Sequence, residues 1–272
     1  MPLKAFYGST SWGSGILKAW LGGVVDLTTV DWPRKACFLI FLTGCNLRCP
    51  FCQNSALIPM NSGESVDVDV VVDRFKRNLP LVEGVHVTGG EPTLQSAALR
   101  SLCSKFKSLG VGVSISTNGT CPQVLKELID NELVDHIALD VKAPLEVGAY
   151  SLATGLSRAD WVVASVKRSL EVCVKARSEG SITLEARTTV VPTLNDEEDS
   201  VAKIAKAIGD TCDYYVLQQF EPSDKVLDPR FKALKAPSRE KLLRLAKVAL
   251  NHGVRLVLLK TRSHGIEELP KP

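Results

Sequence analysis

The chain has 272 residues, of which 45% are hydrophobic and 23% are charged, a balance typical of a globular protein with a sizeable core. Its formal net charge of +3 is too small to indicate nucleic-acid binding, although a weakly basic surface can help to dock an acidic protein partner. No apolar run approaches the ~18–20 residues of a membrane helix, and the N-terminus lacks the apolar region of a signal peptide. We therefore expect a cytoplasmic protein with no nucleic-acid or membrane partner.

Apolar, β-branched runs alternate with amphipathic stretches along most of the chain. The runs predict strands over Cys37–Leu42, Gly84–Thr88, Val111–Ser116, His136–Val141, Thr183–Val191, Tyr214–Gln218 and Arg255–Leu259. Helical spacing between them predicts helices over Gln95–Leu109, Pro122–Asn131, Trp161–Ala176, Ser200–Ile208 and Ser238–Asn251. Repeated strand–helix–strand units give a parallel sheet with right-handed crossovers. The sequence thus predicts an α/β fold, a partial or full (β/α) barrel with about six core units.

The least regular parts of the chain lie at its start and near its end. We predict that residues 1–30 form an N-terminal extension that packs on the barrel, and that residues 31–272 form the barrel domain. The charged stretch Ser223–Pro237 is predicted to be an exposed loop. Because active sites of such folds lie beyond the C-terminal ends of the strands, chemically active motifs should follow strands directly.

Three of the eight cysteines fall within eight positions, and the other five are scattered. In the cytoplasm such cysteines are more often thiols or metal ligands than disulfides. Cys45, Cys49 and Cys52 directly follow the first predicted strand with C-x3-C-x2-C spacing, and three thiolates on one loop bind a soft metal centre. Structural zinc needs four ligands, often in paired C-x2-C form, and no second pair is present. An iron–sulfur cluster with one open iron is therefore favoured over zinc or unligated cysteines.

Three weaker motifs also lie at the ends of predicted strands. Gly89 and Gly90 allow a ligand to approach the backbone, and Glu91 can accept hydrogen bonds from an ammonium group. Asn118 offers donors and acceptors to a nucleoside. The alternative for both segments is an ordinary turn. Asp140 and Lys142 close a strand and can bind polar ligand groups, with a surface ion pair as the alternative.

Two further features involve polar side chains on predicted strands. Arg187 lies within a β-branched strand, so it must face either a ligand carboxylate or Glu185 on the same face. Residues 218–220, Gln-Gln-Phe, could equally be barrel packing with a polar rim. The four histidines fit no metal spacing, and we interpret them as core or surface residues: His86, His136, His252 and His264. The parallel topology places all strand-end motifs on one rim of the barrel.

The cysteine triplet with Phe51, followed by the Gly89–Pro92 turn, resembles the radical S-adenosylmethionine (SAM) superfamily from about Val30 to the end of the chain. Three further segments resemble the glycyl-radical-enzyme activases: residues 31–33 (Asp-Trp-Pro), 44–46 (Gly-Cys-Asn) and 52–54 (Cys-Gln-Asn). Within that branch, residues 217–220 and the overall length resemble the archaeal-type activating proteins of anaerobic ribonucleoside-triphosphate reductase.

The resemblance implies a [4Fe–4S] cluster ligated by Cys45, Cys49 and Cys52, with SAM on the fourth iron. It implies no catalytic residue apart from the cluster and SAM. The resemblance implies that Gly89, Gly90 and Glu91 hold the amino group of SAM, and that the ribose and carboxylate lie at Asp140, Val141 and Lys142. Asn118 and Arg187 would assist in binding SAM. The adenine would lie near Phe51 and Gln53.

The activity implied by this resemblance is reductive cleavage of SAM, followed by abstraction of a hydrogen atom from a glycine of a partner reductase. An electron donor such as ferredoxin or flavodoxin would be needed. The alternatives are a pyruvate formate-lyase-type activase, a small-molecule radical SAM enzyme, and a metal-binding or electron-transfer module without catalysis. Ser116 stands where formate-lyase activases have an Asp that holds a monovalent cation, and Phe220 stands near the place of their His. Both differences favour reductase activation, and Ser116, which has no charge, puts a cation site in doubt.

Overall fold

The computed structural model describes residues 17–270, so residues 1–16 of the predicted extension lie outside the described part of the chain. In that part, ten strands form one sheet in the order β10-β9-β8-β7-β6-β5-β4-β2-β1-β3. Their bounds are β1 Lys18–Thr28, β2 Cys37–Leu42, β3 Glu64–Asp67, β4 Gly84–Gly89, β5 Gly112–Thr117, β6 His136–Asp140, β7 Thr183–Val190, β8 Tyr214–Gln219, β9 Leu256–Thr261 and β10 Gly265–Pro270.

In the centre of the sheet, every contact between neighbouring strands is parallel, and the strands concerned are β2, β4, β5, β6, β7, β8 and β9. At one edge β1 pairs antiparallel with both β2 and β3, and at the other edge β10 pairs antiparallel with β9. Because β3 and β10 end the strand order without meeting, the sheet is open and the molecule is a partial barrel. The predicted α/β class and parallel topology are confirmed.

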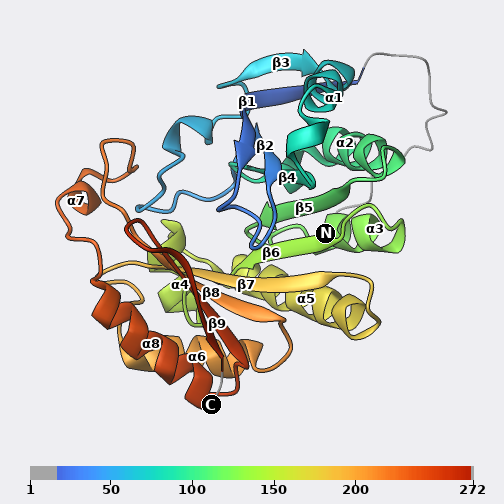
Figure 1. Cartoon of the computed structure of the whole chain (residues 1–272). Coiled ribbons are helices and arrows are strands. Elements are labelled where there is room, and N and C mark those ends of the chain that lie inside the picture. The colour runs from blue at the N-terminus through green and yellow to red at the C-terminus, as the bar shows by residue number, and fades with distance from the viewer. Residues whose placement is uncertain (1–16, 271–272) are drawn as a thin grey trace, which may run out of the picture.

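Helices cover the outer face of the curved sheet (Figure 1). They are α1 Val68–Lys76, α2 Ser96–Ser108, α3 Pro122–Asp130, α4 Val147–Thr154, α5 Asp160–Ser178, α6 Glu198–Ile208, α7 Pro229–Lys232 and α8 Arg239–Asn251. The five predicted helices correspond to α2, α3, α5, α6 and α8. The segment predicted as an exposed loop, Ser223–Pro237, includes the short helix α7 and buries Val226. Among the described helices, none is long and apolar enough to span a membrane.

The core lies between the helices and the sheet. Strand β2 is buried almost throughout, which explains its unbroken apolar sequence. Phe75 of α1 packs edge-to-face with Phe38 of β2 and Phe106 of α2, with ring centroids 5.5 Å and 5.0 Å apart. These contacts fix the helices that flank the first two parallel strands.

The inner face of the sheet carries a hydrogen-bonded polar network rather than apolar side chains alone. The Ser114 hydroxyl lies 2.6 Å from His86 Nδ1 and 2.7 Å from His136 Nδ1, and the second ring nitrogen of His136 lies 2.8 Å from the Tyr214 hydroxyl. Trp32 stacks on His136 with ring centroids 5.5 Å apart. Both buried histidines are therefore core residues, as the sequence predicts.

Candidate functional site

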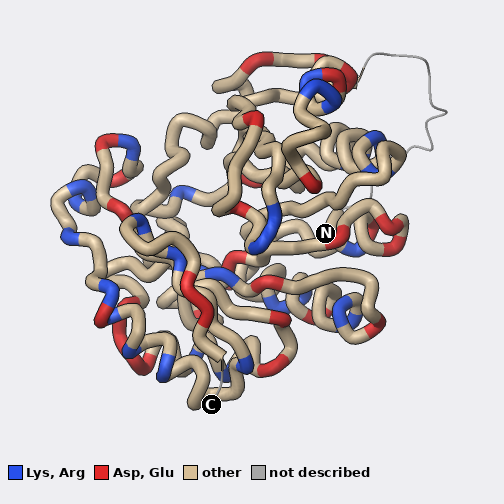
Figure 2. Tube along the Cα trace, viewed as in Figure 1, with Lys and Arg blue, Asp and Glu red and all other residues tan. Residues whose placement is uncertain are grey.

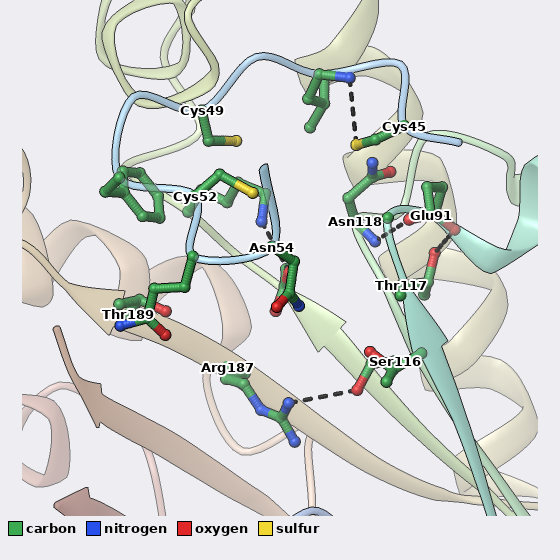
Figure 3. A pocket seen from close by; sticks show the side chains of 18 of the residues that line it. Cys45, Cys49, Cys52, Asn54, Glu91, Ser116, Thr117, Asn118, Arg187 and Thr189 are labelled. Carbon is green, nitrogen blue, oxygen red and sulfur yellow. Dashed lines mark hydrogen bonds and ion pairs between the residues drawn. The ribbon is translucent and has the colours of Figure 1, made fainter. Parts of the chain in front are cut away.

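A cavity opens at the carboxyl ends of the parallel strands, where the sequence places the motifs. Its lining comes from the cysteine loop after β2 and from the ends of β4, β5, β6, β7 and β8. Figure 3 shows Cys45, Cys49 and Cys52 on one side of this cavity and Arg187 on the other. One rim of the partial barrel thus brings the motifs together.

The cysteine loop is held by backbone hydrogen bonds to the segment that follows it. Gly44 N–H donates to the Leu57 carbonyl at 2.8 Å, and Cys45 N–H donates to the Ile58 carbonyl at 2.9 Å. Gly44 has φ +91°, and a Cβ there would come within 2.5 Å of Met60. This tight, left-handed turn directs the loop back over the end of the sheet.

The sulfur atoms of Cys45, Cys49 and Cys52 point toward one another across the cavity (Figure 3). Burial raises the pKa of the Cys49 thiol to about 12 and also raises the pKa values of the Cys45 and Cys52 thiols. Metal binding would displace these protons, because the thiolate is the ligand. Within residues 17–270, no three His, Cys, Asp or Glu side chains are grouped as ligands of a single metal ion. Three soft donors that face a shared space fit a multi-iron cluster.

The Gly89–Gly90 turn packs directly against the cysteine loop. Gly90 N–H donates to the Leu42 carbonyl at 2.9 Å, and Glu91 N–H donates to the Gly44 carbonyl at 2.7 Å. A Cβ at Gly89 would lie 1.9 Å from the Leu42 oxygen, and one at Gly90 would lie 2.2 Å from the Gly44 oxygen. Only glycine permits this approach, which leaves the backbone of the turn on the cavity wall.

Glu91 is fully buried and already has four donors. Its Oε1 accepts from the Thr93 hydroxyl at 2.6 Å, the Thr117 hydroxyl at 2.8 Å and Thr93 N–H at 3.1 Å. Its Oε2 accepts from Asn118 N–H at 2.6 Å. Burial raises the pKa of Glu91, while these hydrogen bonds oppose that shift. Because a carboxylate has about four acceptor positions, Glu91 chiefly joins the loops after β4 and β5.

Asn118 links the same β5 loop to the cysteine loop. Its Nδ2 donates to Asn46 Oδ1 at 3.0 Å, and its Oδ1 accepts from the Thr120 hydroxyl at 2.6 Å. Asn46 Nδ2 donates to the Thr120 hydroxyl at 2.8 Å. The side chain lines the cavity, but its amide serves mainly to hold the two loops in register.

The opposite wall carries two ion pairs, of which Lys142–Asp140 is partly buried and Arg187–Glu185 is mostly buried. Lys142 Nζ lies 2.7 Å from Asp140 Oδ2, and Arg187 Nε lies 2.6 Å from Glu185 Oε1. Burial would lower the pKa of Lys142, but the Asp140 carboxylate raises it above the ordinary value. Burial would raise the pKa of Glu185, but the charge of Arg187 lowers it to about 2. Both cations are therefore fixed in charge at neutral pH and line the cavity.

Arg187 contacts Glu185, which is one of the two partners that the sequence allows it. Its guanidinium also donates to the Ser116 hydroxyl at 3.3 Å while facing the cavity (Figure 3). Glu185 Oε2 has no hydrogen-bond partner among the described residues and lies 3.5 Å from His136 Nε2. The pair connects the cavity to the polar network inside the barrel.

Of the three remaining predicted residues, two line the cavity and Val141 does not. Phe51 and Gln53 line the cavity, and Gln53 Nε2 donates to the Glu221 carbonyl at 2.7 Å. Val141 is fully buried, and its backbone N–H donates to the Arg187 carbonyl at 2.8 Å. It lies outside the lining of the cavity, so its place in the structure is that of a spacer between Asp140 and Lys142.

Seven lining residues are missing from the predicted set: Leu47, Asn54, Thr88, Ser116, Thr117, Thr189 and Gln218. For some of them, the position in the sequence next to a predicted residue could have indicated that they line the cavity. Thr189 lies two residues after Arg187 on the same strand, so alternation places it on the same face. Ser116 and Thr117 precede Asn118 at the end of β5. Gln218 belongs to the segment 218–220, whose sequence is compatible with a polar rim.

The sequence profile of the Radical SAM superfamily matches residues 39–205, which contain the cysteine loop, the glycine turn and the cationic wall. This chain belongs to the radical SAM superfamily. It is therefore an enzyme of this group, and its cofactors are a [4Fe–4S] cluster and SAM. The three thiols and the mixed polar lining of the cavity fit both groups.

Relatives within the radical SAM superfamily include a Methanocaldococcus jannaschii protein named as a glycyl-radical enzyme activating enzyme. It is 36% identical over 233 residues, which cover 86% of this chain and 92% of its own length. A pyruvate formate-lyase-activating enzyme of Clostridium pasteurianum is 25% identical over 77% of this chain and 88% of its own. A 7-carboxy-7-deazaguanine synthase of Hyperthermus butylicus is 35% identical over 48% of this chain and 58% of its own.

Solved structures agree with the radical SAM fold. A radical SAM methyltransferase from Sphaerobacter thermophilus superposes with a TM-score of 0.64 at 16% identity, covering 86% of this chain and 68% of its own. A domain of a pyruvate-formate lyase-activating enzyme from Bacteroides vulgatus superposes with a TM-score of 0.50 at 14% identity, covering 65% of this chain and 99% of its own. At these identities the likeness shows the fold alone.

Proposed function

We propose that this radical SAM enzyme installs a glycyl radical on a partner enzyme, and that the partner is anaerobic ribonucleoside-triphosphate reductase. The observation that carries the proposal is the similarity, along most of the chain, to a protein named as a glycyl-radical enzyme activating enzyme. It is supported by a cavity in which three thiols face two fixed cations. The reaction would take place in the cytoplasm, with a ferredoxin or flavodoxin as electron donor.

In this proposal, Cys45, Cys49 and Cys52 ligate the cluster. When bound, the cluster and SAM supply the one-electron cleavage that yields a 5′-deoxyadenosyl radical. Lys142 and Arg187 present fixed positive charge to the carboxylate of SAM, and ion pairing with Asp140 and Glu185 holds their side chains in place.

The other cavity residues orient SAM through the backbone and through packing. The Gly89–Gly90 turn lines the cavity and offers backbone groups to the amino group of SAM. Glu91 and Asn118 fix the position of that turn relative to the cysteine loop. Phe51 and Gln53 lie on the cavity wall, where they would border the adenine.

Two residues favour the reductase as partner over formate lyase. The Ser116 hydroxyl accepts a hydrogen bond from Arg187 and lies 2.8 Å from His86 Nε2, so it is engaged by protein groups rather than offered to a cation. Phe220 is fully buried and does not line the cavity. These are the two positions at which the formate-lyase activases have Asp and His.

The test is incubation of the reconstituted, reduced protein with SAM and a candidate reductase under anoxic conditions. We expect a glycyl radical signal on the reductase by electron paramagnetic resonance. The Cys49→Ala variant should give none, because it lacks one cluster ligand. Deoxyadenosine formation without a radical on the reductase or on a formate-lyase-like enzyme would contradict activation.

A small-molecule substrate is the second candidate, because the partial relative from Hyperthermus butylicus is named as a 7-carboxy-7-deazaguanine synthase. The same incubation separates the two candidates. A small-molecule enzyme would form 5′-deoxyadenosine in amounts that depend on that substrate and not on any partner protein.

A further inference from the structure

A groove lies on the outer side of the cysteine loop, facing away from the SAM cavity. Its walls come from Arg48 and Pro50 of that loop, from the end of α4, and from residues 227–234 around α7. Figure 1 shows the α7 segment as a projecting loop at the left edge of the molecule. None of the SAM-contacting residues proposed above lines this groove, so it is a separate feature.

Only the thickness of the cysteine loop separates this groove from the cluster ligands. Leu227 N–H donates to the Cys52 carbonyl at 3.1 Å, and Asp228 N–H donates to the Pro50 carbonyl at 2.9 Å. On the other wall, Arg48 N–H donates to the Thr154 carbonyl at 2.9 Å. A molecule seated in the groove would therefore contact chain segments that are hydrogen-bonded to the cluster-binding loop itself.

The centre of the groove is apolar and exposed. Leu152 on α4 is 67% exposed and Leu227 is 38% exposed. Phe231 and Leu234 are partly buried beside them. Exposed apolar side chains that gather in one concave place are typical of a contact surface.

The α7 segment that forms one wall of the groove carries cations close in sequence to the lining residues. In the part of the chain that the structure describes, Arg48 on the other wall has no carboxylate within 4.0 Å, and the same holds for three exposed lysines of the α7 segment: Lys225, Lys232 and Lys235. Arg230 is paired with Asp228, and the segment also carries Asp224. The Arg48 guanidinium also donates to the Cys45 and Leu47 carbonyls at 2.9 Å and 2.8 Å. These bonds hold its charge against the cysteine loop, to which Arg48 belongs. Figure 2 shows basic residues along the α7 segment, together with acidic ones before the helix.

We propose that this groove is the docking surface for an acidic one-electron carrier protein, which reduces the cluster through the Arg48–Cys52 loop. The proposal rests on the proposed function, because only a redox-active cluster needs such a carrier. In the transfer the carrier is oxidised by one electron and the cluster is reduced by one, with no bond made or broken. The carrier needs this side of the loop because SAM and the radical-accepting glycine occupy the other.

Electrostatics and size agree with an acidic carrier as the occupant. Unpaired cations around an apolar centre steer an acidic partner and orient it, and they act mainly on the association rate. Electron-transfer encounters use small interfaces, under about 1,200 Å², so a single groove of this kind is sufficient. A carrier held in this way can leave after each electron.

The test uses a triple variant, Lys225→Glu, Lys232→Glu and Lys235→Glu, and reduced flavodoxin as the acidic probe. We expect the rate at which flavodoxin bleaches the visible absorbance of the cluster to fall about 10-fold or more. Oxidised flavodoxin should bind the variant about 10-fold more weakly by calorimetry, and its binding should lose most of its salt dependence. Cluster reduction by dithionite should be unchanged, because it needs no docking.

The matched control carries Lys167→Glu, Lys206→Glu and Lys247→Glu on α5, α6 and α8. These three lysines are exposed and, among the described residues, have no carboxylate within 4.0 Å, so the change in net charge is the same. The control should keep the wild-type rate with flavodoxin. An equal loss in the control would overturn the proposal, because net charge alone would then explain the effect.

Two other outcomes separate the docking surface from the proposed function. If the Lys225/Lys232/Lys235 variant binds flavodoxin as wild type does, the groove is not the carrier site. If that variant fails to activate the partner even with dithionite, the groove serves the partner instead, and the proposal is overturned. Absence of SAM cleavage by dithionite-reduced wild type would instead refute the proposed function.

Discussion

Lys142 and Arg187 are the two charged side chains that best explain how this cavity would hold an anionic ligand group. Each is largely but not fully buried, each is paired with one carboxylate, and each still lines the cavity. Pairing offsets the cost of burial and prevents either side chain from leaving the wall. The positive charge is thus in place before any ligand arrives, which is the condition for tight and oriented binding.

Replacing Lys142 tests its assignment to the SAM carboxylate. Lys142→Ala should bind SAM about 10–100-fold more weakly, since a hydrogen bond to a charged group contributes about 1.5–3 kcal/mol. Iron content should be unchanged, because Lys142 does not ligate the cluster. SAM titration and iron analysis measure the two effects, with Lys206→Ala on α6 as the control. Normal SAM affinity in Lys142→Ala would show that the assignment is wrong.

Glu185 should make stability depend on pH. Its pKa falls from an ordinary value of 4.5 to about 2 in the folded protein, so its ionised form stabilises the fold. Glu185→Gln should lower the free energy of unfolding at pH 7 by about 3–5 kcal/mol, because it leaves Arg187 buried without its partner.

The difference between wild type and Glu185→Gln should stay constant above pH 4.5 and shrink as the pH falls toward 2. Urea unfolding of the cluster-free proteins at pH 7, 5, 4 and 3.5 measures it. A difference that is absent at pH 7, or that grows as the pH falls, would contradict this account of the pair.

At the scale of elements, the buried parallel strands were predictable because each is a short run rich in apolar and β-branched residues, even though their inner face also carries polar side chains. Helix α1 was not, because Val68, Val70, Val71 and Val72 are β-branched and have strand character. Its helical form depends on spacing and on a cap: Val68, Val71, Val72 and Phe75 are buried, and Asp67 accepts from Asp69 N–H at 2.9 Å. A cap and a buried face outweigh the intrinsic preference here.

This cap gives a prediction for α1. Asp67→Ala should lower the free energy of unfolding by about 1 kcal/mol, the usual effect of losing an N-cap side chain. Asp67→Asn should keep most of that stability, since an amide oxygen can accept the same bond. Denaturant unfolding of the three proteins measures the difference. Equal stability of Asp67→Ala and wild type would mean that packing of Phe75 alone determines the helix.

Other elements escaped prediction for different physical reasons. Helix α4 is short, contains Gly148 and has no strong apolar face, and it ends at Gly155 with φ +68°. Strand β10 is a partly exposed edge strand with two adjacent glutamates, so its sequence lacks a buried pattern. Both are determined by neighbours in space, α5 for the helix and β9 for the strand.

At the scale of the whole molecule, the position of the cavity was predictable, but the hydrogen bonds that hold its loops together were not. Parallel strands necessarily bring their carboxyl ends to one edge, so the motifs had to meet. The contacts between loops depend on positions distant in sequence, such as Thr117 donating to Glu91 and Asn118 donating to Asn46. For this reason the sequence could place Glu91 and Asn118 at strand ends, where both line the cavity, but it could not show that they join loops.

The central claim is that a glycine of a partner enzyme gives up the hydrogen atom. The most direct measurement uses a candidate reductase whose glycines carry two deuterium atoms on Cα, incubated with reduced protein and SAM. We predict 5′-deoxyadenosine with one deuterium, detected by mass spectrometry, in step with the growth of the glycyl radical. Unlabelled 5′-deoxyadenosine alone, formed at the same rate with or without the reductase, would contradict the account.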